Sequence, residues 1–334
     1  MAYKYSTQMQ RAPLHYIPED SRLSFLPIPA ARTALFEHYR SQLDVRWRAE
    51  EIKLHEDRAE YERMDKDTQH FIRHGLALFA QFDRIVNINI AETFEREIDI
   101  PEIKLILHEQ MAAEDIHAHT YSMQINEIIP DADEREKTLN AIQNFPTLAK
   151  LHKWLLSYRD APFAERIIAA ACLEGLIFIT VFCFIYWIGE HHPMPGLVQA
   201  NELIARDENK HVTTLTMIYE LIMVGDQCTQ GRVHEIIDGA VAIGKQFITE
   251  ALPHDLEGMN KKLMTEYLQY SADLLATRFG YGRLYWIKAQ PFEFMEKINL
   301  RVRTNFFERH NTNYEKKTSK DVVANASACI DYDI

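Results

Sequence analysis

Hydrophobic residues recur three and four positions apart along most of this chain, and strict alternation of apolar and polar residues is scarce. The clearest example reads PEIKLILHEQMAAEDIHAHTYSMQINEII; it begins at Pro101, stops before Pro130 and contains no glycine. Proline is tolerated in the first turn of a helix but not in its interior. The pattern therefore predicts one long helix between these two prolines.

Two other segments show the same period. Residues 71–94 read FIRHGLALFAQFDRIVNINIAETF, and residues 196–225, after Pro195, read GLVQANELIARDENKHVTTLTMIYELIMVG. A helix of about 25 residues is close to 40 Å long, which suits a large bundle better than a surface element. Because alternating segments are scarce as well, we predict an all-α fold.

The stretch from Ile167 to Gly189 reads IIAAACLEGLIFITVFCFIYWIG and carries a single charged residue, Glu174. Its length would allow a transmembrane helix. No second such stretch exists, however, and charged segments flank it, so we favour a fully buried helix of a large bundle and expect no membrane association. A buried carboxylate is costly unless its charge is compensated, and a bound metal ion would compensate it.

Each of these four segments supplies side chains that can bind a metal ion. The candidate ligands are Asp83, Glu114, His117, Glu174, Glu208 and His211. Two Glu-x-x-His pairs put a carboxylate and an imidazole on one helical face, although about one such pair is expected by chance in a chain of this composition. Two such helices with two further carboxylate-bearing helices predict a site for two metal ions. A carboxylate-rich ligand set favours iron or manganese.

Composition excludes several classes of function. A net charge of -12 argues against a nucleic-acid-binding surface. The cysteines show no C-x-x-C spacing, so neither a disulfide framework nor a zinc site is expected; they are Cys172, Cys183, Cys228 and Cys329. The N-terminus lacks the apolar core of a signal peptide, and phosphate-binding glycine motifs and G-x-S-x-G are absent. A cytoplasmic protein fits these features best.

The chain shows no internal break that would separate two domains. Glycine and proline number only 11 and 12, and four of the prolines fall before residue 30. We expect an extended N-terminal arm at residues 1–30 and a helical domain at 31–309. Residues 310–334 are polar and end in an alternation of Ile330, Tyr332 and Ile334. They are predicted to form a flexible tail that offers a short peptide to another protein.

The segments EDIHAHTY, LEGLIFITVF and LIARDENKH resemble the small, radical-generating subunit of class I ribonucleotide reductase. FDRIVNINIAETF, MPGLVQANELIARDE and QPFEFMEKINLRVRTNFFERHNTNY agree with that family in order and spacing. The resemblance extends from roughly residue 20 to the C-terminus. It implies a ferritin-like helical bundle with a buried di-metal carboxylate site, and the family's ligands fall on the six residues selected above without substitution.

The resemblance places the family's radical-bearing tyrosine at Tyr121, four residues after His117 on the same helical face. It assigns the apolar shield around that radical to Phe178, Phe182 and Ile204. Without the resemblance, the same residues would be interpreted as ordinary core packing.

A radical-transfer path is implied as well. Asp207 and Trp47 match the family's aspartate and tryptophan, and the aspartate would hydrogen-bond the ligand His117. Tyr314 matches the tail tyrosine that relays the radical outward, with Tyr332 as the alternative. Taken alone, Trp47 could be a packing residue, Asp207 a solvated charge and Tyr314 one of 15 tyrosines.

The implied activity is that of the small (beta) subunit of ribonucleoside-diphosphate reductase, an oxidoreductase of deoxyribonucleotide biosynthesis. Two iron ions, or manganese or a mixed pair, would activate dioxygen, and Tyr121 would store the resulting radical. A large (alpha) subunit docked through the tail would receive the radical and reduce ribonucleotides. The chain itself would form a homodimer.

Three other functions are compatible with the ligand pattern. A di-iron oxygenase or desaturase would use the same ligands on a small substrate and would need neither Tyr121 nor a tail. A ferroxidase or iron-storage protein is usually a shorter chain that assembles into a shell. A metal-free helical scaffold would bind no metal. Substrate-dependent oxygen consumption, particle mass and metal content distinguish these functions.

Overall fold

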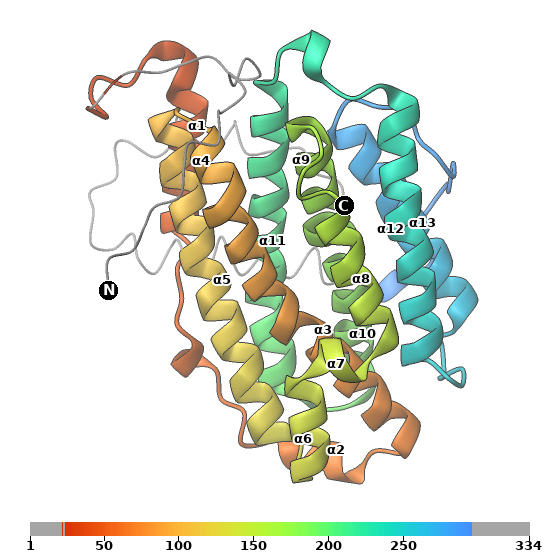
Figure 1. The fold of residues 1–334 in the computed structure, drawn as a ribbon. Helices are drawn as coiled ribbons and strands as arrows, with labels where there is room; N and C mark the ends of the chain where they lie inside the picture. The colour runs from red at the N-terminus through yellow and green to blue at the C-terminus, as the bar shows by residue number, and fades with distance from the viewer. Residues whose placement is uncertain (1–21, 23, 296–334) are drawn as a thin grey trace, which may run out of the picture.

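The computed structural model describes residue 22 and residues 24–295, which form a bundle of long helices (Figure 1). This part of the chain contains no β-strand, only one isolated bridge between Leu256 and Met259. The prediction of an all-α fold is therefore confirmed.

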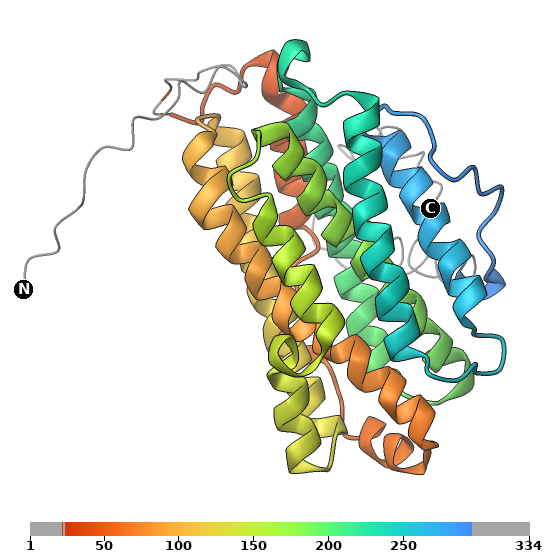
Figure 2. The ribbon, with the colours of Figure 1, turned by 45° about the vertical axis from the view of Figure 1, so that its right-hand side comes forward.

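Four long helical segments form the centre of the bundle. They are α3 (Lys66–Asn89), α5 (Pro101–Ile128), α11 (Pro195–Glu220) and the apolar segment made of α9 (Phe163–Cys172) and α10 (Phe178–His191). Helix α3 packs along α5, and α10 packs along α11. On the other side of the apolar segment, α12 (Gln230–Ala251) and α13 (Lys261–Arg278) lie side by side (Figure 2).

Short helices fill the ends and sides of the bundle. They are α1 (Thr33–Leu43), α2 (Asp57–Arg63), α4 (Glu95–Glu97), α6 (Ala132–Leu139), α7 (Ala141–Asn144) and α8 (Pro146–Ser157), with 3₁₀ turns at Ala30–Arg32, Ala49–Glu51 and Val224–Asp226.

Outside the apolar segment, the predicted helices agree with the observed ones except at their ends. Helix α5 starts at Pro101 as expected. Helix α3 starts five residues earlier than the apolar pattern does, because the Asp65 side chain caps it by accepting a hydrogen bond from the backbone N–H of Thr68 at 2.9 Å. The first amides of α11 are also capped, since Gly196 and Leu197 donate to the Asp57 carboxylate at 3.1 and 2.6 Å.

The composition of the apolar segment suggested one continuous α-helix. The structure shows that this helix is interrupted. A π-helical turn at Leu173–Ile177 separates α9 from α10, and a second π-helical turn at Ile90–Phe94 follows α3. A π-turn inserts an extra residue and changes where the neighbouring side chains point, and such turns are frequent at functional sites. Here the first one carries Glu174.

The helix from Phe163 to His191 is the only one in the described part that is long and apolar enough to cross a membrane. Of its most apolar window, 83% is buried inside the bundle. It is therefore a core helix of this fold, and the interpretation preferred from the sequence is confirmed.

Candidate metal centre

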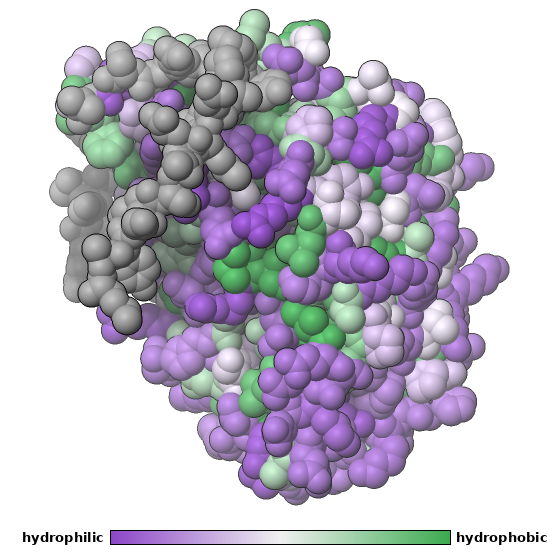
Figure 3. Space-filling view, viewed as in Figure 1, coloured by the Kyte–Doolittle hydropathy of each residue, from purple (hydrophilic) through white to green (hydrophobic). Residues whose placement is uncertain are grey.

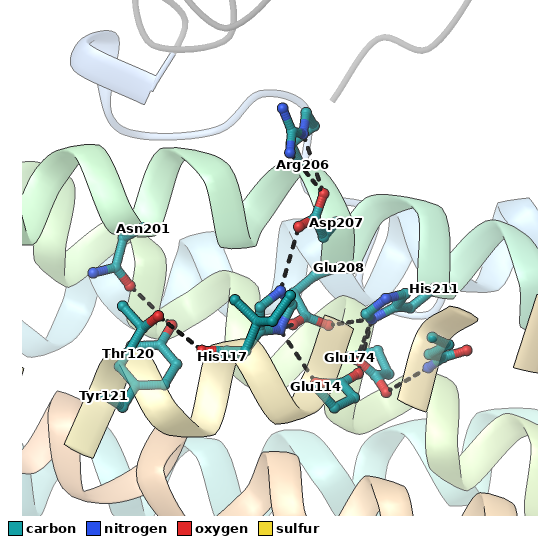
Figure 4. A network of polar contacts seen from close by, with 12 residues as sticks. Glu114, His117, Thr120, Tyr121, Glu174, Asn201, Arg206, Asp207, Glu208 and His211 are labelled. Atoms are coloured by element: carbon teal, nitrogen blue, oxygen red, sulfur yellow. Dashed lines mark hydrogen bonds and ion pairs between the residues drawn. The ribbon is translucent and has the colours of Figure 1, made fainter. Parts of the chain in front are cut away.

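The structure brings all six candidate ligands together at the centre of the bundle. Figure 4 shows five of them, Glu114, His117, Glu174, Glu208 and His211. The ligand atoms form two groups in which all atoms lie within 4.8 Å of one another. One group contains Glu114, Glu174, Glu208 and His211, and the other contains Asp83, Glu114 and His117. All six side chains are buried. Helix α3, helix α5, the π-turn after α9 and helix α11 supply them.

Two glutamates lie between the two histidines. His117 Nδ1 is 3.2 Å from Glu114 Oε2 and 3.0 Å from Glu208 Oε1. His211 Nδ1 is 2.9 Å from Glu114 Oε1 and 3.0 Å from Glu208 Oε2. Each carboxylate thus faces both rings, so both could ligate cations held beside the histidines.

Asp83 shows that this cluster fits cations. Its side chain is fully buried, and within residues 22 and 24–295 neither of its carboxylate oxygens has a hydrogen-bond partner. Buried polar atoms without partners are rare in proteins because they have lost their hydration without compensation. Two divalent cations would balance the charge of the four carboxylates and provide the missing partners.

Protonation of the cluster reflects the same excess of negative charge. Burial raises the pKa of Asp83 and Glu174 well above the usual range, and neighbouring carboxylates add to the effect. Burial alone would lower the pKa of His117 and His211, but the surrounding carboxylates outweigh it and raise both. Metal ligands bind in their deprotonated form, so raised pKa values at these four residues predict that metal binding releases protons.

Asp207 links the cluster to a tryptophan. Its Oδ2 lies 3.4 Å from His117 Nε2 and accepts a hydrogen bond from Trp47 Nε1 at 2.8 Å, while Arg206 pairs with Oδ1 at 3.1 Å. Although burial opposes the charged carboxylate, the bond to His117 and the charge of Arg206 lower the pKa of Asp207. The Trp47 ring stacks near the His117 ring at a centroid distance of 6.1 Å. An ionised carboxylate thus orients His117 and contacts Trp47 at once.

Tyr121 is fully buried on α5 among aromatic rings. Its ring stacks on Phe79 with centroids 4.6 Å apart and an interplanar angle of 4°. Phe178 and Phe182 in turn lie 5.3 and 4.8 Å from the Phe79 ring, and Ile204 is buried as well. The surroundings of Tyr121 are thus mostly apolar and closed to solvent.

The sequence interpretation missed three residues of this region. Phe79 lies against Tyr121, Asn201 accepts the Tyr121 hydroxyl hydrogen bond at 3.0 Å, and Gln110 Nε2 donates to Glu174 Oε1 at 3.3 Å. Each lies one or two helical turns before a candidate ligand on the same helix, so helical periodicity could have found them. Tyr314 and Tyr332 lie outside the described residues.

Hydrophobic side chains gather near the middle of the face shown in Figure 3. An apolar pocket of about 140 Å³ is lined by the exposed Ile88 and Leu156, and also by the buried Gln110 and Glu174. One candidate ligand, Glu174, thus reaches the wall of this pocket. A second, more polar pocket of about 430 Å³ is lined by Trp47 and Asp207, among others.

Comparison with known proteins agrees with this geometry. Residues 26–291 match the family model described as ribonucleotide reductase, small chain. The ribonucleoside-diphosphate reductase small chain of Trypanosoma brucei brucei is 39% identical over 294 residues, which covers 87% of each chain. The relatives named as small chains of this reductase do not favour the oxygenase and iron-storage alternatives.

Solved structures share the fold. The ribonucleotide reductase Rnr4 homodimer of Saccharomyces cerevisiae has a TM-score of 0.73 and 26% identity, covering 89% of this chain and 91% of the other. The dimanganese(II)-NrdF of Streptococcus sanguinis has a TM-score of 0.70 at 13% identity, covering 84% and 99%. The predicted ferritin-like bundle is thus confirmed. With a family match over most of the chain and a buried cluster of four carboxylates and two histidines, this protein belongs to the ribonucleotide reductase small-chain family.

Proposed function

We propose that this chain is the small subunit of a ribonucleoside-diphosphate reductase and that its metal centre generates and stores a radical on Tyr121. The observation that carries the proposal is the buried cluster of four carboxylates and two histidines, with an enclosed tyrosine on the same helix as Glu114 and His117. Family membership supports the reductase activity.

In this proposal, Asp83, Glu114, His117, Glu174, Glu208 and His211 would hold the two metal ions. When bound, the metal pair would supply the oxidising power derived from dioxygen. The protein's residues would hold the cations in a fully buried place and keep water away from Tyr121. Oxidation of Tyr121 would remove one electron and the hydroxyl proton. Burial, together with the charge of Asp83, raises the pKa of that hydroxyl well above its usual range, so the phenol keeps its proton until it is oxidised.

The radical-transfer path would begin at Asp207 and Trp47. The hydrogen bonds from His117 through Asp207 to Trp47 connect the cluster to a residue that lines the larger pocket. We propose Tyr314, with Tyr332 as the alternative, as the relay from there to a large subunit. Residues 310–334 would dock that subunit, and residues 1–30 would form an arm beside the helical domain.

The metal is proposed to be iron. Carboxylate and imidazole ligands suit iron and manganese alike, so a dimanganese or mixed pair would use the same residues. We place the protein in the cytoplasm as a homodimer. Cys172, Cys183 and Cys228 are all free thiols, which suits a reducing compartment.

Electron paramagnetic resonance tests the proposal. Metal-free protein is loaded with ferrous iron and exposed to oxygen, and the wild type is compared with Tyr121→Phe. A tyrosyl signal is expected in the wild type and none at that site in the variant. If the wild type gives no radical with iron, nor with manganese and an activating reductant, the proposal is wrong.

The proposed role of the tail has its own test. Deletion of the last eight residues should abolish turnover with the large subunit but leave the tyrosyl signal unchanged, because the metal centre lies within the helical domain. Unchanged turnover after this truncation would rule out docking through the tail.

A further inference from the structure

The hydroxyl of Tyr121 has one hydrogen-bond partner within the described part of the chain. This partner is neither a candidate metal ligand nor one of the apolar residues around Tyr121. The Tyr121 O–H donates to Oδ1 of Asn201 at 3.0 Å, and both side chains are fully buried (Figure 4). Asn201 therefore determines where the phenol proton points before any oxidation occurs.

The orientation of the Asn201 amide is locked. Its Nδ2 donates to the backbone oxygen of Leu197 at 2.8 Å. The Tyr186 hydroxyl donates at 3.2 Å to the backbone oxygen of Asn201, so that bond does not involve the amide. The Leu197 oxygen can only accept, so the amide nitrogen must face it and Oδ1 must face Tyr121. Rotating the amide would place two acceptors against each other and leave the phenol O–H without an acceptor.

This lock has a chemical consequence for oxidation. Forming a neutral tyrosyl radical removes one electron, which a bound and oxidised metal pair would accept, and one proton from the hydroxyl. An amide oxygen accepts a hydrogen bond but is far too weak a base to keep that proton. The released proton therefore cannot remain on Asn201 and has to pass to another group.

After oxidation, the Tyr121 oxygen can only accept hydrogen bonds, and it faces Asn201 Oδ1, which can only accept too. The amide thus stabilises the phenol and gives no hydrogen bond to the radical. We propose that Asn201 is a positioning residue that favours the phenol over the radical and so makes the stored radical a stronger oxidant. This inference rests on the proposed assignment of Tyr121 as the radical residue.

The test uses full-length protein loaded with ferrous iron and oxygen. Asn201→Leu keeps the side-chain size but removes the acceptor. Tyr186→Phe is the matched control, because it removes a neighbouring hydrogen bond to the Asn201 backbone and leaves the amide in place. Two properties are measured, the gx value of the radical in high-field electron paramagnetic resonance and its half-life against hydroxylamine.

A donor to the phenoxyl oxygen lowers gx, so gx should be the same in the wild type, Asn201→Leu and Tyr186→Phe. The half-life should lengthen about twofold to tenfold in Asn201→Leu only, as expected for loss of one hydrogen bond that favours the phenol. An increase of gx in Asn201→Leu would mean that Asn201 donates to the radical, and an unchanged half-life would mean that it has no influence. Either result would overturn the inference.

Asn201→Asp provides a second test in case the Leu variant does not fold or bind metal. A carboxylate can keep the released proton and donate it back, so this variant should show a lower gx than the wild type. An unchanged gx would overturn the inference. Absence of any radical from the wild type would instead refute the proposed function, which Tyr121→Phe examines separately.

Discussion

At the scale of single residues, the site consists of ionisable side chains that are buried together. Glu174 is the one charge in an otherwise apolar stretch, and the candidate ligands grouped with it come from two other helices, α5 and α11. Asp207 is different, since it is held ionised by His117 and Arg206 while it accepts a bond from Trp47. Its charge, rather than its shape, distinguishes it from an asparagine.

Asp207→Asn should keep the bond from Trp47 and lose the negative charge that faces His117. We expect a radical to form still, and turnover with the large subunit to fall about 10- to 100-fold, the range found for groups that orient metal ligands. Turnover and spin concentration are measured on the same samples. The exposed Asp160→Asn serves as control, and equal turnover in both variants would contradict a role for Asp207.

A second residue-scale prediction concerns acid stability. His74 is buried and its ring contacts the backbone oxygen of His70 at 2.8 Å. Burial, together with the charge of His70, lowers the pKa of His74 to about 3. The unfolded chain takes up this proton below its ordinary pKa of about 6.5, whereas the folded protein does not until about pH 3. The free energy of unfolding should therefore fall as the pH drops through this window.

The loss from this one group is about 1.4 kcal/mol per pH unit. In His74→Gln, urea unfolding of the metal-free protein between pH 4 and 6 should show a slope smaller by roughly this amount. His55→Gln, at an exposed position, should leave the slope unchanged. If His74→Gln and the wild type lose stability equally with acid, His74 is not buried in its neutral form.

At the scale of elements, helix ends and π-turns aim the site residues. The π-turn at Leu173–Ile177 lets Glu174 join the cluster while the rest of the apolar segment stays in the core. Helix α11 is held at its start by Asp57, and this helix carries Asn201, Asp207, Glu208 and His211 further along. A change at the start of α11 therefore affects the whole helix.

Gly196→Ala tests this attachment. A Cβ at Gly196 would lie 2.4 Å from the Lys53 backbone oxygen and 2.8 Å from Asp57 Oδ2, so the capping contact must move. We expect a loss of about 1–3 kcal/mol in the free energy of unfolding, despite the better helix propensity of alanine. Gly231→Ala in the first turn of α12, where a Cβ meets open space, should be neutral or stabilising. Equal effects in denaturant unfolding would show that α11 is not fixed at this point.

At the scale of the whole molecule, the metal centre is the place where the four central helical segments meet. Burial and neighbouring carboxylates raise the pKa of Asp83, and neighbouring carboxylates raise that of His211 although burial opposes it; Asp83 also lacks hydrogen-bond partners in the described structure. The candidate ligands come from segments far apart in the chain and meet only in the folded protein. Cations that bind only the folded state therefore stabilise the entire bundle.

Anaerobic ferrous loading should raise the melting temperature by about 5 °C, since ligand at 100 times its dissociation constant adds about 2.7 kcal/mol. Metal binding should also release protons, measurable as buffer-dependent heat in calorimetry. Asp83→Asn should reduce both effects. A melting temperature that does not respond to bound iron would mean that the ligand cluster does not join these helices energetically.

Much of this protein is encoded locally. Apolar residues spaced by three and four determined the long helices, because an α-helix repeats every 3.6 residues. Glu and His at i and i+3 likewise predicted which faces carry ligands, and Pro101 set the start of α5. Resemblance to a known family added Tyr121, Asp207 and Trp47, which no periodicity distinguishes from core or surface residues.

Only the tertiary structure decided how the helices meet. Tyr121 and Asn201 are 80 residues apart, and Trp47 and Asp207 are 160 residues apart, so their hydrogen bonds depend on packing between elements. The same holds for Phe79 against Tyr121 and for the π-turn at Glu174, since that distortion places a buried charge among its partners. Helical periodicity states which face a residue occupies, but the partner across the interface exists only in the folded bundle.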